Sequence, residues 1–102
     1  MDTSEKNHIL FTQVVFMFHA AAMHQLGKIK NPLTDKIEHD LAAAQGTIDL
    51  LDMLKEKTKG NLTKEEDHFL TDMIRELKLN YVDEAKKPGP ETSKGEEGKK
   101  TG

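Results

Sequence analysis

The sequence contains no cysteine. Disulfide bonds, thiolate nucleophiles and cysteine-based zinc sites are therefore excluded. A long hydrophobic run is also missing, because the most apolar stretch, residues 9–23, includes Thr12, Gln13 and His19. A stretch so short and so polar is a poor membrane span. The leader MDTSEKN is not net positive, which disfavours a signal peptide, and we expect a cytoplasmic protein.

The sequence also lacks a basic stripe. Residues 1–85 carry 10 basic and 15 acidic side chains, a balance of −5, whereas residues 86–102 carry 5 basic and 3 acidic ones, a balance of +2. Binding to duplex nucleic acid requires a positively charged surface, so we expect no such partner. Weak contact of the basic tail with RNA or an acidic protein is a lower-ranked alternative.

Patterns typical of catalysis are missing as well. The sequence has no phosphate-binding loop, no dinucleotide fingerprint and no serine nucleophile elbow. No two histidines are four residues apart, the spacing that would place two imidazoles on one face of a helix. Asp49 and Asp52 are one helical turn apart, but they lie on a polar face without a histidine or arginine partner. We therefore predict no catalytic, cofactor-binding or metal-binding residues.

The hydrophobic periodicity predicts an all-α domain of three helices. These helices span residues 7–26, 40–59 and 64–83, and we find no strand pattern and no internal repeat. A chain of 102 residues, 35% apolar and 32% charged, has room for one small domain. Small domains bury a modest share of their surface, so marginal stability or oligomerisation is expected.

The ends of the chain differ in composition from the middle. We expect residues 1–6 to form a flexible leader, residues 7–85 the helical domain and residues 86–102 a disordered tail. The tail is rich in proline and glycine and has almost no apolar residue. Ser4 or Asn7 is the expected N-cap of the first helix.

The first helix has no single apolar face. At 100° per residue, two groups of apolar side chains point in nearly opposite directions, with Leu10 and Met17 between them. The first group is Phe11, Val14, Phe18, Ala21 and Ala22, and the second is Ile9, Phe16 and Met23. A helix that is apolar nearly all round must be covered nearly all round, so we expect it to be central in the fold.

The second helix has two apolar faces, with Asp40 as its expected N-cap. The first face is Leu41, Ala44, Ile48, Leu51 and Leu54, and the second is Ala43, Gly46, Leu50 and Met53. A glycine inside a helix costs about 1 kcal/mol relative to alanine, which the close approach of another helix would explain. The second face therefore indicates more contacts than one neighbouring helix supplies.

Residues 48–66, IDLLDMLKEKTKGNLTKEE, predict a sharp corner between the second and third helices. Lysines in the last turn suit the helix dipole, and Gly60 fits the left-handed position after a helix end. Thr63 followed by Glu66 matches the capping box at a helix start. The second and third helices should therefore form an antiparallel hairpin. The apolar arc of the third helix is Phe69, Leu70, Met73, Ile74, Leu77 and Tyr81.

Residues 28–40 connect the first two helices and contain Asn31-Pro32, which breaks a helix. The connection is long for a compact helical protein. Two interpretations stay open. The segment is either a strap held on the bundle by Ile29, Leu33 and Ile37, or a loop that binds a partner.

Three segments of the sequence are similar to a known family. They are FTQVVFMFHAAAMHQLGKIKNP, DLAAAQGTIDLLDMLKEKTKGNLTKEED and FLTDMIRELKLNYV, and together they cover about residues 10–82. They resemble a bacterial domain-of-unknown-function family, number eighteen forty-four, through Phe11, Leu26-Gly27, Asn31-Pro32 and the block from Ile48 to Thr63. The resemblance implies a small, largely helical bacterial protein. It implies no established activity, so it assigns no active-site residues.

We predict a homo-oligomer, most simply a dimer, because three helices of this length cannot cover so much apolar surface. The candidate interface residues are Phe11, Val14, Phe18, Ala43, Gly46 and Leu50, and the residues of the structural corner are Gly60, Thr63 and Glu66.

The function that these patterns favour is a non-enzymatic protein-interaction or scaffold module. The alternative is a helical protein that binds a small molecule or a metal through His19, His24 or Asp49, in a cavity between helices or subunits.

Overall fold

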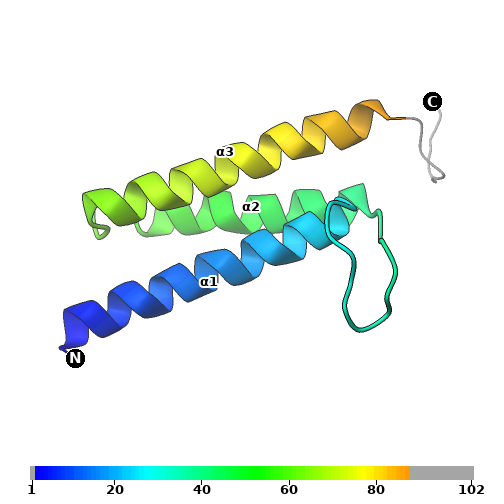
Figure 1. The fold of residues 1–102 in the computed structure, drawn as a ribbon. Coiled ribbons are helices and arrows are strands. Elements are labelled where there is room, and N and C mark those ends of the chain that lie inside the picture. The colour runs from blue at the N-terminus through cyan, green and yellow to red at the C-terminus, as the bar shows by residue number, and fades with distance from the viewer. Residues whose placement is uncertain (1, 88–102) are drawn as a thin grey trace.

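The structure, a computed structural model, describes residues 2–87 and consists of three helices. They are α1 (Thr3–Gln25), α2 (Leu41–Lys57) and α3 (Lys64–Lys86). In Figure 1, α1 and α3 run in the same direction and α2 runs antiparallel to both. The all-α, three-helix prediction is confirmed for residues 2–87. The tail predicted to be disordered lies outside the described residues, except for Lys86 and Lys87.

Helix α1 begins earlier than predicted, at Thr3 rather than Asn7. Asp2 is the N-cap, in place of Ser4 or Asn7, and its carboxylate accepts a hydrogen bond from the Glu5 backbone N–H at 2.8 Å. The Glu5 side chain accepts from the Asp2 N–H in return, at 3.3 Å. This capping box satisfies two amides that would otherwise have no partner, so the chain is helical well inside the segment expected to be a flexible leader.

The core is a single cluster to which all three helices contribute. Its buried apolar residues are Val15, Ala22, Leu26, Ala44, Ile48, Leu51, Leu70, Ile74 and Leu77. They include the middle of the first face predicted for α2 and the middle of the arc predicted for α3. Burying a side chain the size of leucine contributes about 1.5–3 kcal/mol, so these contacts hold the three helices together.

Helix α1 is not central, contrary to our prediction. Each helix packs against both of the others, so each one buries only the side that faces the bundle axis. Leu10 and Met17 of α1 are exposed, and Met17 keeps 69% of its surface accessible. Part of the apolar surface of α1 is therefore left exposed by the described residues.

The corner between α2 and α3 has the predicted geometry. Gly60 has a φ of +88°, in the left-handed region. Thr63 caps α3: its hydroxyl accepts from the Glu66 backbone N–H at 3.1 Å, and the Glu66 carboxylate accepts from the Thr63 N–H at 2.9 Å. At the other end of α2, Asp40 is the predicted N-cap and accepts from the Ala43 N–H at 3.0 Å.

The connection between α1 and α2 extends away from the bundle as a loop (Figure 1). Asn31 closes this loop, because its N–H donates to the Lys36 carbonyl and its carbonyl accepts from the Asp35 N–H, both at 2.8 Å. The predicted strap is wrong. Ile29, Leu33 and Ile37 are all exposed, Leu33 at 93%, because the loop satisfies its backbone through its own hydrogen bonds.

Two contacts anchor the ends of the connection to the helices. The Asp40 N–H donates to the Gln25 carbonyl at 2.7 Å, which joins the start of α2 to the end of α1. Gly27 has a φ of +81°, and a Cβ added there would lie 3.0 Å from the Glu38 carbonyl oxygen. No helix within residues 2–87 is long and apolar enough to cross a membrane.

Candidate interaction surface

The exposed apolar side chains of α1 and α2 form two rows. On α1, Leu10, Val14 and Met17 follow one another at spacings of four and three residues. On α2, Leu50 and Met53 are exposed and continue a row that begins with Ala43 and Gly46. Residues three or four apart are neighbours on a helix surface, so each set forms a continuous stripe.

Both rows border the contact between α1 and α2. The Thr47 hydroxyl of α2 donates to the Gln25 side chain of α1 at 2.8 Å, which shows the side on which the two helices meet. Ala43 and Leu50 lie one turn before and after Thr47 on α2. Ala21, which lies one turn before Gln25, continues the row of α1. The two rows therefore form one face, which we call the α1–α2 surface, made of Leu10, Val14, Met17, Ala21, Ala43, Gly46, Leu50 and Met53.

The α1–α2 surface contains no formally charged side chain. Residues 7–27 and 41–48 have no aspartate, glutamate, lysine or arginine. The charged residues that follow one turn beyond the rows are Lys6 on α1, and Lys57 and Asp40 at the two ends of the α2 row. Because α1 and α2 are antiparallel, both lysines lie at the same end of the surface. The apolar side chains of the two rows can themselves be buried without desolvating an ion, and Asp49 lies at the margin of the α2 row.

The structure places the predicted interface residues in two different environments. Val14 and Leu50 are exposed, Ala43 is half-buried, and an added Cβ at Gly46 would meet nothing within 4 Å. The close approach invoked for Gly46 is therefore not made by another part of residues 2–87. Phe11 and Phe18, in contrast, pack against the core.

Three exposed residues of the same surface were not among the predicted interface residues. Leu10, Met17 and Met53 were recognised as apolar, but they were left out of the candidate interface. The signal was present in the spacing, because Leu10, Val14 and Met17 form one stripe when α1 is drawn as a wheel. A helical wheel does not show where the two neighbouring helices pack against α1, and their positions decide which apolar side is covered.

Three of the five histidines contact glutamates of α3. These contacts join α1 or the connection to α3, so they help to hold α3 against the rest of the chain. The atom pairs are His8 Nδ1 with Glu66 Oε2 at 2.8 Å, His19 Nε2 with Glu76 Oε1 at 2.9 Å, and His39 Nε2 with Glu84 Oε1 at 3.0 Å.

Glu66 connects the predicted corner to the start of α1. Its carboxylate accepts from the Thr63 N–H and contacts His8, and its side chain is mostly buried. The backbone hydrogen bond from Thr63, followed by the contact with His8, lowers the pKa of Glu66 against the opposing effect of burial. The predicted corner residues Gly60, Thr63 and Glu66 are therefore structural, and Glu66 also contacts a second helix.

A second buried carboxylate, Glu84, lies near the other end of α3. Lys28 contacts it at 2.6 Å, Lys87 at 2.7 Å and His39 at 3.0 Å. Burial by itself would raise the pKa of Glu84, but the hydrogen bonds from Lys28, Lys87 and His39 outweigh it and lower the pKa to about 2. Glu84 and Asp83 in turn raise the pKa of Lys28. Lys87 is three residues from Glu84, but Lys28 and His39 are far from it in the chain, so no local sequence pattern indicates their part of the cluster.

The residues named for a small-molecule or metal site are not brought together. His19 contacts Glu76, and Asp49 accepts from the Gln45 side chain at 2.9 Å. The Nδ1 atom of His24 is buried and has no hydrogen-bond partner among the described residues. Within residues 2–87, no three histidine, aspartate or glutamate side chains are grouped as metal ligands.

The fold and the surface define the class of this protein: within residues 2–87 it is a small three-helix domain with an uncovered apolar face on α1 and α2. Residues 8–84 match the model of the family described as domain of unknown function DUF1844, so the chain belongs to that family, as its sequence resemblance indicated. Comparison with curated proteins gave no match, and comparison with solved structures gave none.

Proposed function

We propose that this protein is a non-enzymatic interaction module that works as a homodimer, with the α1–α2 surface of one copy packed against the same surface of the other. The observation that carries the proposal is the uncovered apolar face without formal charge. Apolar patches that a monomer leaves exposed commonly mark interaction sites. We place the dimer in the cytoplasm, where a chain without cysteine needs no oxidising environment.

The distribution of charge supports a second copy as the partner. A two-fold axis brings the same patch against itself, so any charge at its centre would meet a like charge. The α1–α2 surface has none there. Its α2 row begins one turn after Asp40 and ends one turn before Lys57. In an antiparallel pair of α2 helices, Lys57 of one copy would approach Asp40 of the other.

The size of the surface sets the expected strength of the dimer. The 17 residues of α2 give a length of about 25 Å, and two helices give a width of about 20 Å. The projected area of roughly 500 Å² is at the small end of specific interfaces. We therefore expect a dissociation constant on the order of micromolar.

Light scattering after size exclusion and sedimentation equilibrium test the dimer across a concentration series up to about 100 μM. The protein should change from monomer to dimer within this range. Leu50→Asp should remain monomeric, because it would bury a charge at the centre of the interface. The matched control is Leu79→Asp, an equally drastic change of an exposed leucine on α3, which should dimerise normally.

Two outcomes contradict the proposal. One is a wild-type protein that is monomeric at the highest concentration. The other is a Leu50→Asp variant that dimerises as strongly as the wild type, since the interface would then lie elsewhere.

A further inference from the structure

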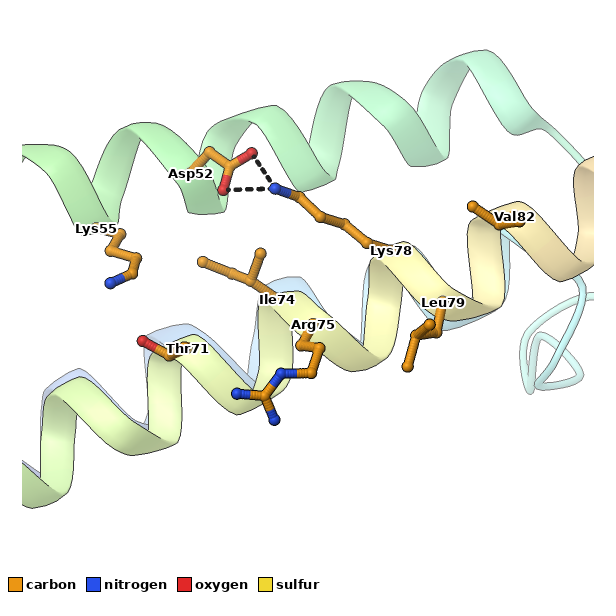
Figure 2. Close-up of a pocket in the computed structure, with 8 residues that line it drawn as sticks. All are labelled: Asp52, Lys55, Thr71, Ile74, Arg75, Lys78, Leu79 and Val82. Carbon is orange, nitrogen blue, oxygen red and sulfur yellow. Dashed lines mark hydrogen bonds and ion pairs between the residues drawn. The ribbon is translucent and has the colours of Figure 1, made fainter.

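A groove of about 380 Å³ lies between α2 and α3 (Figure 2). We call it the α2–α3 groove; it is lined by Asp52, Lys55, Thr71, Ile74, Arg75, Lys78, Leu79 and Val82. It is separate from the α1–α2 surface. Phe69 of α3 contacts Phe16 of α1. Thr71 and Lys78 are two and nine residues after Phe69, so they lie on nearly the opposite side of α3.

The lining of the groove is apolar along three turns of α3. Thr71, Ile74, Lys78 and Val82 fall on successive turns, and Leu79 lies beside them. Eleven residues separate Thr71 from Val82, so the groove extends about 16 Å along the helix. Leu79 is 66% exposed and Val82 is 50% exposed, so no described part of the chain covers this apolar strip.

Three of the eight side chains that line the groove are cationic, although the chain as a whole is acidic. Lys55, Arg75 and Lys78 line it against a single carboxylate, that of Asp52, whereas the whole chain has a net charge of −3. Lys78 reaches across the groove from α3 to Asp52 of α2, at 3.1 Å (Figure 2).

The other two cations also have partners, and these pairs are exposed. Arg75 pairs with Asp72 at 3.0 Å and Lys55 with Asp67 at 3.6 Å. Exposed pairs of this kind are weak, so the cations can turn to the carboxylates of a ligand at little cost.

We propose that the α2–α3 groove binds a short amphipathic helix of another protein, one that has an acidic flank. Its apolar side would lie on Ile74, Leu79 and Val82, and its carboxylates would face Lys55, Arg75 and Lys78. An open groove between two helices, about three turns long, suits a helix better than a compact small molecule. The chain's own residues 88–102, PGPETSKGEEGKKTG, have no large apolar side chain to fill it.

The binding site is independent of the proposed dimer. The groove lies on a different pair of helices, so a monomeric Leu50→Asp variant should bind the same peptide as the wild type. A dimer would present two such grooves, and a monomer one.

Fluorescence polarisation with two synthetic peptides tests the proposal. Both peptides carry leucines at positions i, i+3, i+4 and i+7 over about four helical turns. One has glutamates on the flank of this stripe, and the other has lysines at the same positions. The glutamate peptide should bind at least about tenfold more tightly, and added salt should reduce the difference.

Variants of the full-length chain then locate the site. Leu79→Asp should weaken binding of the glutamate peptide at least about tenfold, because a charge would replace apolar contact area. The double variant Arg75→Glu and Lys78→Glu should reverse the preference in favour of the lysine peptide. Val82→Asn is a milder second test of the apolar strip, should Leu79→Asp lose its helical circular dichroism. Leu50→Asp is the matched control and should leave peptide binding unchanged.

Equal binding of the two peptides would overturn the proposal, as would a double variant that keeps its preference for glutamate. Dodecanoate serves as a further probe. If dodecanoate binds in the groove and the glutamate peptide does not, the ligand is a single-chain amphiphile rather than a helix, and the proposal fails.

Discussion

Two glycines illustrate how differently one residue type is used in this chain. Gly60 has a φ of +88° and ends the turn after α2. Gly46 lies inside α2, and an added Cβ would meet nothing within 4 Å. The backbone therefore requires glycine at position 60 and not at position 46.

Replacement of these glycines by alanine should change stability in opposite directions. Gly46→Ala should stabilise the monomer by about 0.5–1 kcal/mol, because alanine loses less backbone entropy in a helix. Gly60→Ala should destabilise it by about 1–2 kcal/mol, because a Cβ is strained in the left-handed region. Urea unfolding followed by circular dichroism, at a concentration low enough to keep the chain monomeric, gives both values.

The Gly46→Ala variant also reports on the proposed interface. At higher protein concentration Gly46→Ala should lose its advantage, because the extra methyl group would stand between two α2 helices. If Gly46→Ala destabilises even the monomer, Gly46 is not open as the structure describes.

At the scale of elements, α3 is held near both ends by a buried carboxylate. Glu66 lies beside the start of α1, and Glu84 lies beside the connection. The pKa of Glu84 is about 2 in the folded chain, against an ordinary value of 4.5. A carboxylate with a lowered folded pKa stabilises the fold above its ordinary pKa, and this contribution is lost as the pH falls from about 4.5 to about 2.

Glu84→Gln should therefore reduce stability near neutral pH and flatten its acid dependence. We expect a loss of about 1–3 kcal/mol, the range for hydrogen bonds to a charged group, moderated because Lys87 is half in solvent. Urea unfolding at a series of pH values between about 2 and 7 measures both effects. Glu56→Gln, on the exposed side of α2, is the control and should change little. If the free energy of unfolding of Glu84→Gln falls as steeply with decreasing pH as that of the wild type, the proposed role of this carboxylate is contradicted.

The elements also show which features could be predicted from the sequence. The corner at Gly60 and Thr63 is local, since its hydrogen bonds join residues three apart, and the sequence sufficed there. The contacts of Glu84 with Lys28 and His39 join residues more than forty positions apart, and no periodicity indicates such pairings. The start of α1 was predictable in principle, because Asp2 and Glu5 form a capping box as Thr63 and Glu66 do.

The candidate interface was partly predictable, for a related reason. Periodicity identified Val14 and Leu50 as members of apolar rows. It also selected Phe11 and Phe18, which pack against the core, since a wheel gives the angle between two residues but not where the other helices lie. The connection failed as a prediction because apolar Leu33 suggested burial, whereas the backbone of Asn31 and Asp35 closes the loop on itself.

At the scale of the whole molecule, the chain has two exposed apolar faces, which differ in charge. The α1–α2 surface is apolar and without charge, and the α2–α3 groove is apolar with a cationic rim. Helix α2 contributes to both, through different sides. A dimer formed on one face would leave the other free in each copy, so self-association and partner binding would not compete.

The absence of native cysteine allows a direct test of the arrangement of the dimer. Gly46→Cys should be cross-linked between copies by a short bismaleimide, because two antiparallel α2 helices packed 8–10 Å apart would place these positions on the order of 10 Å from each other. Asp72→Cys, on the exposed side of α3, is the control and should give several-fold less product on a denaturing gel. Equal cross-linking of both variants would indicate random collision.

The loop between α1 and α2 makes the protein easy to label or extend. The hydrogen bond between the Asn31 N–H and the Lys36 carbonyl brings the two ends of the turn together, and Leu33 between them is 93% exposed, with its N–H bonded to the Asn31 side chain. A folded reporter whose own termini are adjacent would therefore fit between Leu33 and Thr34 without removing a core contact. Lengthening such a loop costs only about 0.6 kcal/mol per doubling. The position gives a handle for imaging or capture that leaves both the α1–α2 surface and the α2–α3 groove untouched.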